Sequence, residues 1–238
     1  MIFLRNIFAI LISIIAFSSC TKQEAHNNGD NSGSNKEIVK PVDTSRTFNL
    51  TDKQKKILAG AKKCLEDKFQ YDMSMGYYVL KYKNGVNTGT KVFPGGDLEP
   101  NLGVCTEVTI RSLRYAGIVD LQEAIYNDLV SHWSDYPMDR WGAKKPDVNI
   151  DQRRVPNQLI WFKKHWEEVE LNNKNDYQPG DVIIWDMDGD SWGDHLGIVS
   201  DKFADGKPYL IHNFPSPGYV AEENVLNRWN IIGHYRVK

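Results

Sequence analysis

Cys105 occupies a position at which a thiol could act as a nucleophile. It follows Gly103 and Val104 and opens the stretch Cys105 to Ala116, which the pattern predicts to be a helix closed by Gly117. The first turn of a helix presents unpaired N–H groups and the positive end of the helix dipole. Both stabilise a thiolate, the nucleophilic form, and lower the pKa of the thiol. Gly103 would let a substrate approach the backbone there. The alternative is a cysteine buried in the core, which is common for this residue type.

Two histidines could supply the base that such a thiol requires. His195 begins a predicted strand directly after a polar turn, a position that would expose the imidazole while the strand holds it in place. It would take the proton from Cys105 as a general base. His212 ends the next predicted strand, and antiparallel pairing would bring it beside His195, to hydrogen-bond the ring and set its tautomer. Asn213 is the alternative orienting residue.

Helices are predicted in the first part of the folded region. Thr51 to Gln54 reads as a capping box, and apolar residues follow it at helical spacing as far as Phe69. Cys64 falls on that apolar stripe, so its expected role is packing. Three further helices are predicted at Cys105 to Ala116, Asp120 to about Trp133, and Pro156 to about Trp166.

Strands are predicted mainly after Pro179-Gly180, where short β-branched runs lie between turn residues. Helices followed by antiparallel strands indicate an α+β architecture in one domain. The predicted strands are Tyr77 to Tyr82, Asp181 to Trp185, His195 to Asp201, Pro208 to His212, and Ile231 to Val237.

Residues 1–20 predict export. Arg5 precedes an apolar run from Ile7 to Phe17, which is too short to span a bilayer as a helix but suits the core of a signal peptide. Ser18 and Ser19 stand before Cys20, and small residues before a cysteine resemble a bacterial lipobox. Cys20 would then be lipidated and become the mature N-terminus, and an ordinary signal peptide is the alternative.

Residues 21–47 are expected to form a flexible tether, because they hold four Asn, a Gly/Ser cluster and few apolar residues. The folded domain is therefore expected to comprise residues 48–238. Apart from Cys20 the chain has two cysteines, and in an exported protein a Cys64–Cys105 disulfide is an alternative to a free nucleophile.

Composition and charge favour a globular domain that does not bind nucleic acid. Of the 238 residues, 41% are hydrophobic and 25% are charged, which is typical of globular proteins. The formal net charge of −2 lacks the basic excess that nucleic-acid binding requires. We expect a monomer with no nucleic-acid partner.

Several motifs together resemble the NlpC and CHAP branches of the papain-like cysteine peptidase superfamily. These are Cys105 at a helix start, Pro179-Gly180-Asp181-Val182 leading into a strand, His195-Leu196-Gly197-Ile198-Val199, and Ile211-His212. Further segments look like a bacterial family of unknown function within that superfamily, over residues 52–238. They are Gly103-Val104-Cys105-Thr106, Asn149-Ile150-Asp151 with Arg153-Arg154-Val155-Pro156-Asn157, and Gly233-His234-Tyr235-Arg236.

The resemblance implies a papain-like fold, in which a nucleophile at a helix N-terminus packs on an antiparallel sheet. It also implies catalytic roles for Cys105, His195 and His212, and no cofactor. The expected reaction is cleavage of amide bonds through an acyl-enzyme, in peptidoglycan stem peptides. The alternatives are acyl transfer or ester hydrolysis by the same cysteine, and a non-catalytic module that binds the cell wall. Phe93 and Gln152 depart from the family pattern, which usually has tyrosine and histidine there.

The same resemblance, together with the leader, places the protein at a bacterial envelope. The lipid on Cys20 would anchor it to a membrane, and the expected location is the outer membrane facing the periplasm, or the cell surface.

Three charged residues are candidates for substrate binding. Arg153 and Arg154 could grip a carboxylate of a peptide, since guanidinium groups suit bidentate recognition. Asp97 could bind a substrate amine. The alternatives are that the arginines form ion pairs with Asp147 or Asp151, and that Asp97 caps a loop.

No metal site is expected. Asp186, Asp188 and Asp190 alternate as in a calcium loop, but Ser191 and Gly197 stand where an EF-hand needs Gly and Glu. A polar hairpin explains this run more simply. Zinc on Cys105, His195 and His212 is the other alternative, and a cysteine at a helix start suits a nucleophile better.

Overall fold

The computed structural model describes residues 42–43, 46–75, 78–171 and 176–238. The predicted leader, the lipidation site Cys20 and most of the tether lie outside these residues. Within the expected tether, the N–H of Asp43 donates to the carbonyl of Phe203 at 2.8 Å, and the Arg46 guanidinium lies 4.5 Å from the centre of the Phe203 ring. Contact with the folded domain therefore begins a few residues before position 48.

The predicted helices form close to their expected bounds. Thr51 caps the first with the predicted capping box, and the Asp120 carboxylate caps the third by accepting from the N–H of Gln122. Pro156 lies in the first turn of the fourth, where its missing N–H costs no hydrogen bond. The described residues form four α-helices: α1 (Asp52–Asp67), α2 (Cys105–Tyr115), α3 (Leu121–Ser131) and α4 (Val155–His165).

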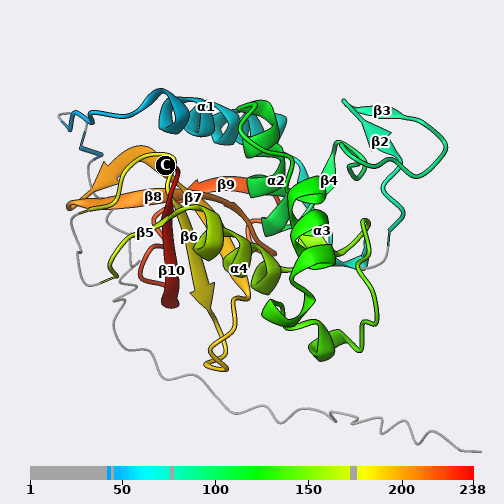
Figure 1. Cartoon of the computed structure of the whole chain (residues 1–238). Coiled ribbons are helices and arrows are strands. Elements are labelled where there is room, and N and C mark those ends of the chain that lie inside the picture. The colour runs from blue at the N-terminus through cyan, green and yellow to red at the C-terminus, as the bar shows by residue number, and fades with distance from the viewer. Residues whose placement is uncertain (1–41, 44–45, 76–77, 172–175) are drawn as a thin grey trace, which may run out of the picture. The chain divides into compact units, whose positions relative to one another are not determined.

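A six-stranded antiparallel sheet forms the other part of the domain, in the order β5-β10-β6-β7-β8-β9 (Figure 1). Four of its strands match predicted ones, and β5 and β9 were not predicted. Its strands are β5 (Glu167–Glu168), β6 (Val182–Asp186), β7 (His195–Ala204), β8 (Lys207–Asn213), β9 (Val220–Glu223) and β10 (Asn230–Arg236). The α+β fold class is confirmed.

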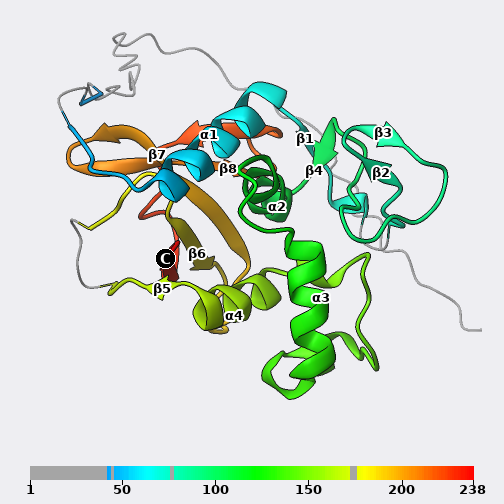
Figure 2. The same cartoon turned by 45° about the horizontal axis from the view of Figure 1, so that its top comes forward.

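Short strands and 3₁₀ helices lie between consecutive α-helices along the chain. β1 (Gln70–Tyr71) pairs in parallel with β4 (Leu102–Gly103), and β2 (Tyr82–Lys83) forms a hairpin with β3 (Val86–Asn87). Both views show this hairpin beyond β4, away from the six-stranded sheet (Figures 1 and 2). The 3₁₀ helices are η1 (Met73–Met75), η2 (Trp133–Asp135), η3 (Met138–Trp141) and η4 (Asp151–Arg153).

The strand predicted at Tyr77 to Tyr82 is wrong for most of its length. Tyr77 lies outside the described residues, and β2 begins only at Tyr82. The N–H of Leu80 donates to the Asn149 side chain, and the carbonyl of Leu80 accepts from the N–H of Val92. Both backbone groups of Leu80 are therefore bonded to loop residues and are not available to pair with a neighbouring strand.

The sheet is buried on both faces. Ile184 and Leu196 pack with Val108 in the main core beneath the helices, while Trp185 and Val199 belong to a second core on the opposite face. α1 and α2 pack on each other and against β7 and β8 (Figure 2). This packing brings the N-terminus of α2 to the strand that begins at His195. Among the helices described, none is both long and apolar enough to cross a membrane.

Candidate active site

Cys105 is the first residue of α2, as predicted. The short strand β4 ends at Gly103, so the chain turns from strand to helix within two residues. Glu107, at the third position of the helix, accepts from the N–H of Val104 at 2.7 Å and caps the helix start. The thiol therefore sits on a stabilised helix N-terminus.

Gly103 is required by packing. A Cβ at this position would lie 2.9 Å from two ring carbons of Phe69 and 3.0 Å from the Cβ of Glu107. We expected the glycine to leave room for a substrate, but in the structure the Phe69 ring takes that room. The glycine thus allows β4 and the start of α2 to pack closely on Phe69.

The Cys105 thiol is buried, and burial raises its pKa to about 12. The negative charge of Glu107 raises it further. Backbone N–H groups of Thr106 and of Cys105 itself lower the pKa, which is the expected helix-start effect, and the N–H of Leu196 on β7 lowers it as well. Burial outweighs that effect, so the expected net lowering of the pKa is wrong for this state and the thiol is neutral.

His195 is buried among aromatic rings at the start of β7. Its ring stacks on Trp185 with 5.4 Å between centroids and meets Phe214 and Trp229 edge-on at 5.0 and 5.3 Å. The expectation of an exposed imidazole is wrong, since the residue is 2% exposed. Burial lowers the pKa of His195 well below its usual value, with smaller effects from His212 and Arg228, so the ring is a neutral base.

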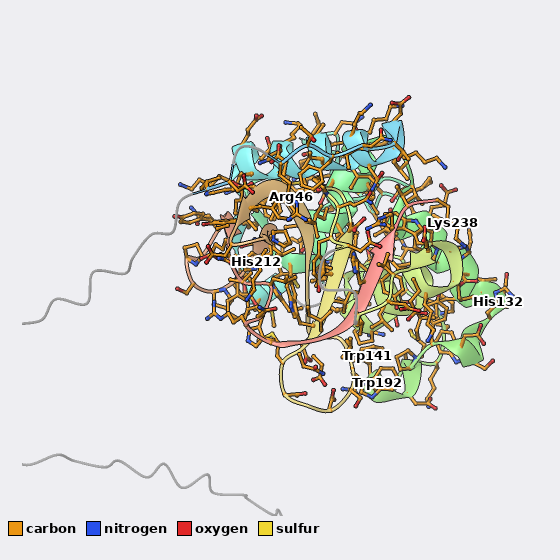
Figure 3. All side chains as sticks on the ribbon, turned by 90° about the vertical axis from the view of Figure 1, so that its left-hand side faces the viewer. Arg46, His132, Trp141, Trp192, His212 and Lys238 are labelled. Carbon is orange, nitrogen blue, oxygen red and sulfur yellow. The ribbon has the colours of Figure 1, made fainter. Side chains whose placement is uncertain are left out.

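His212 hydrogen-bonds His195, as the predicted antiparallel pairing implies. Nε2 of His195 lies 2.8 Å from Nδ1 of His212, which leaves Nδ1 of His195 free of this bond. β7 and β8 pair Ile198 with Ile211, so the two histidines lie on one face of the sheet. Burial lowers the pKa of His212 to about 4. Figure 3 labels His212 on the ribbon.

One backbone contact joins the thiol to the histidine strand. The N–H of Leu196, the residue after His195 on β7, lies near enough to the Cys105 sulfur to lower the pKa of the thiol. The contact belongs to the packing of α2 on β7. α2 therefore packs on the strand that carries His195, and the His195 ring contacts His212 on the next strand.

Asn213 holds the backbone before the nucleophile. Its side-chain amide donates to the carbonyls of Gly103 and Phe69, at 3.3 and 3.5 Å. His212 is the residue that hydrogen-bonds the His195 ring. The hydrogen bonds of the Asn213 side chain go to backbone carbonyls instead, so they do not support the alternative in which Asn213 orients His195.

Two residues of the site were missed by the sequence analysis. Oε2 of Glu223 lies 3.1 Å from Nε2 of His212. Tyr71, half-buried on β1, lies close enough to Cys105 that burial and then the cysteine raise the pKa of its hydroxyl. Glu223 and Tyr71 lie on strands too short to show an alternation of apolar and polar residues in the sequence. The parallel pairing of Tyr71 with Gly103 brings Tyr71 to the site.

The three predicted substrate-binding residues all have partners inside the protein. Arg153 Nε donates to Glu107 at 2.6 Å, in a pair that is almost fully buried. Arg154 pairs with Asp151 at 3.2 Å and lies 4.0 Å over the Trp141 ring. The Asp97 carboxylate pairs with two arginines, Arg111 and Arg114.

Arg154 also borders a cavity of about 480 Å³. Lys91, Lys145 and Trp141 line the same cavity. Figure 3 labels Trp141 and His212, which lie apart in this view.

Both remaining cysteines described by the structure, Cys64 and Cys105, are free thiols. The Cys64 sulfur packs in the core, 3.8 Å from the Val108 carbonyl and 3.5 Å from the Ser112 hydroxyl. Cys64 has the packing role that its position on the helix predicted, and the alternative disulfide is not formed.

The aspartate run gathers four carboxylates on the β6–β7 loop. Oxygen atoms of Asp186, Asp188, Asp190 and Asp194 lie within 4.8 Å of one another. Both oxygens of Asp186 accept backbone N–H groups, from Gly189 and Ser191, and Asp190 pairs with Arg140 at 2.8 Å. These contacts match the polar hairpin that was predicted.

The solved structures that match this chain include the following two. One is NlpC1 from Trichomonas vaginalis, with a TM-score of 0.43 and 11% identity over 80% of this chain, which spans 46% of NlpC1. The other is an N-acetylmuramoyl-L-alanine amidase from Bacteroides uniformis, with a TM-score of 0.45 and 17% identity over 79% of this chain and 100% of the amidase.

Sequence comparison is more specific. The chain is 44% identical over 147 residues to the uncharacterized protein YijF of Escherichia coli. The matched region covers 60% of this chain and 68% of YijF. A family model described as a domain of unknown function, DUF1287, matches residues 58–237. Since this match takes in most of the chain and all the residues of the candidate site, the protein belongs to the DUF1287 family.

Proposed function

We propose that this protein is a cysteine hydrolase that cleaves amide bonds, and that its substrates are peptidoglycan stem peptides. One observation carries the proposal: Nε2 of His195 lies 2.8 Å from Nδ1 of His212, and His195 begins the strand against which the helix of Cys105 packs. A thiol, a neutral base and a group that orients the base are the components of nucleophilic acyl transfer.

The reaction would begin with proton transfer from the Cys105 thiol to Nδ1 of His195. The sulfur then attacks the amide carbonyl carbon, and the C=O π electrons move onto oxygen. Backbone N–H groups at the start of α2 would stabilise that oxyanion. The tetrahedral intermediate collapses to a thioester as His195 gives its proton to the leaving amine. Water, deprotonated by His195, releases the acid and restores the thiol.

The electrostatics favour general-base activation over a stored ion pair. Burial raises the pKa of Cys105 to about 12 and lowers that of His195 well below its usual value. In this state thiol and imidazole are both neutral, because burial disfavours each charged form. The thiolate would form as the substrate binds and the proton moves to His195.

Peptidoglycan is proposed on the motifs shared with NlpC-type and CHAP-type enzymes and on the predicted export. Arg154 is the predicted substrate-binding residue that we retain, because it borders the 480 Å³ cavity with Lys91 and Lys145. These cations suit the carboxylates of stem peptides. Arg153, buried against Glu107, would hold the structure in place. Asp97 borders another cavity, of about 550 Å³, but two arginines hold its carboxylate, so we assign it the same structural role.

Anchoring at the envelope through a lipid on Cys20 also belongs to this proposal. Growth of cells with a labelled fatty acid, followed by recovery of the protein, would measure lipidation. The label should appear on the wild-type protein and be absent from Cys20→Ala. Equal labelling of both would exclude Cys20 as the lipidated residue.

The central test is digestion of purified peptidoglycan, with the released fragments identified by mass spectrometry. Wild-type protein should release peptide fragments with a new amine and a new carboxyl group. Cys105→Ala should release none, while Cys64→Ala, which removes the other described thiol, should remain active. Identical profiles from wild type and Cys105→Ala would reject the hydrolase.

The same experiment separates the alternatives. Transfer of an acyl group to an added amine, dependent on Cys105, would identify an acyltransferase. Loss of ester groups with intact peptides would identify an esterase. Binding to peptidoglycan that is equal in wild type and Cys105→Ala, with no product, would identify a binding module.

A further inference from the structure

The histidine pair continues to a carboxylate. Nε2 of His195 lies 2.8 Å from Nδ1 of His212, and Nε2 of His212 lies 3.1 Å from Oε2 of Glu223. The side chain of His212 is 0% exposed and that of Glu223 is 33% exposed. One hydrogen-bonded line therefore runs from the base to the edge of the protein.

The sheet determines which glutamate takes this position. β8 and β9 pair His212 with Ala221, so Glu223, two residues further, lies on the same face as His212. Glu222 points to the other face, where it accepts from Lys62 at 2.6 Å and from the Ser200 hydroxyl. Adjacent glutamates on one strand thus have different partners.

The positions of the protons follow from the chemistry of the groups. An ionised carboxylate only accepts hydrogen bonds, so Nε2 of His212 must carry the proton that Glu223 accepts. Neutral His212 then has a lone pair on Nδ1, which must accept from Nε2–H of His195. Neutral His195 is left with its lone pair on Nδ1, the nitrogen that faces away from this chain of bonds.

We infer that Glu223 is a positioning residue that fixes the tautomers of both histidines, so that Nδ1 of His195 is the free base for the Cys105 proton. The inference rests on the proposed function of the site. Without a carboxylate to accept from Nε2–H of His212, the bond between the histidines could reverse, with Nδ1–H of His212 donating to Nε2 of His195. Nδ1 of His195 would then carry a proton and be unable to accept another.

Glu223 is also placed to stabilise the charged state. When His195 takes the thiol proton, the positive charge can be balanced through His212 by the carboxylate, as in a catalytic triad. Burial raises the pKa of Glu223, and the Arg228 guanidinium opposes that rise and favours the carboxylate. Arg228 lies 5.4 Å from the Phe214 ring and 4.7 Å from the Trp229 ring, beside the histidines.

The direct test is nitrogen-15 NMR of the imidazoles in the full chain at neutral pH. Two-bond proton–nitrogen spectra distinguish the tautomers. His195 and His212 should both be protonated on Nε2 in the wild type. In Glu223→Ala both should become mixtures of tautomers, and Glu223→Asp should restore part of the Nε2–H population. Glu222→Ala is the matched control and should leave both histidines unchanged.

A second readout is the rate at which iodoacetamide alkylates Cys105. Full general-base assistance raises a rate by about 10² or more. Glu223→Ala keeps the base His195 but not its fixed tautomer, so it should remove part of this assistance and lower the rate about tenfold at pH 7. Glu223→Asp should recover part of the lost rate. Nδ1–H on His195 or His212 in the wild type would overturn the inference. So would wild-type tautomers and alkylation in folded Glu223→Ala. If Glu223→Ala does not fold, the wild-type spectrum and Glu223→Asp still decide.

The two proposals can fail separately. Nε2–H tautomers and Glu223-dependent alkylation without release of peptidoglycan fragments would support Glu223 and reject the proposed substrate. Release of fragments that Glu223→Ala leaves unchanged, with unchanged tautomers, would support the hydrolase and reject the role of Glu223.

Discussion

The backbone N–H of Leu196, the residue next to His195 on β7, lies near enough to the sulfur of Cys105 to lower the pKa of its thiol. The packing of α2 on β7 thus sets the thiol beside the strand that carries His195. The N–H groups of Thr106 and of Cys105 itself lower the pKa of the thiol in the same way.

The alkylation rate of Cys105 should rise steadily with pH from 6 to 10. A thiol with a pKa near 12 beside a histidine with a lowered pKa holds no thiolate–imidazolium pair at neutral pH. Mass spectrometry of each cysteine after a short iodoacetamide pulse would measure this. Cys64, buried without a base, should label more slowly than Cys105. A plateau of rapid Cys105 labelling down to pH 5 would contradict the neutral pair.

The wild-type protein should lose stability in mild acid because of His212. Its pKa is about 4 when folded and 6.5 when unfolded, so between these values the unfolded chain binds more protons. The free energy of unfolding should fall by about 2 kcal/mol from this group between pH 7 and pH 5. His195 acts in the same direction, and Glu223, whose pKa is raised, in the opposite one.

Urea unfolding at both pH values, compared with His212→Asn, would isolate this contribution. The variant lacks the titrating ring, so its stability should depend less on pH. An equal dependence in the two proteins would show that His212 is not held neutral.

Gly103→Ala should destabilise the fold by about 2 kcal/mol, since the added methyl group overpacks the core. Its Cβ would lie 2.9 Å from the Phe69 ring and 3.0 Å from Glu107. Phe69→Leu should reduce the cost of Gly103→Ala, and a double-mutant cycle in urea would measure the coupling. Additive effects would contradict a clash with Phe69.

Arg153→Met should cost about 3 kcal/mol or more, because it leaves the Glu107 charge buried without this partner. The Glu107 and Arg153 side chains are 2% and 5% exposed and their charged atoms are 2.6 Å apart. Glu107→Gln in the same chain should recover part of the loss while keeping an acceptor for the N–H of Val104. Thermal unfolding would measure both.

Arg140→Met is the control for that change. The Arg140–Asp190 pair is about two-fifths exposed on each side, and such pairs contribute about 1 kcal/mol or less. Equal losses in Arg140→Met and Arg153→Met would show that burial of the Glu107–Arg153 pair has no energetic importance.

The helices and the main strands could be predicted because their signals are local. Thr51 and Gln54 form their capping box within one turn, and the strand that starts at His195 has an unbroken apolar run. The prediction of a strand at Tyr77 to Tyr82 was wrong for most of its length because a residue distant in sequence determines the backbone hydrogen bonds there. Asn149 accepts from the N–H of Leu80. β9 was missed because it is only four residues long and forms at the edge of the sheet through its pairing with β8, which the local sequence does not show.

The sequence by itself determined the order of the candidate site residues along the chain, the helix that begins at Cys105 and the strands that hold His195 and His212. Tertiary structure decided the electrostatics, because burial depends on what packs around a group. Only the folded chain shows that aromatic rings enclose His195, that burial keeps the Cys105 thiol neutral, and that Glu223 lies 3.1 Å from His212. Pairing between β8 and β9 makes that last contact, and no local pattern encodes it.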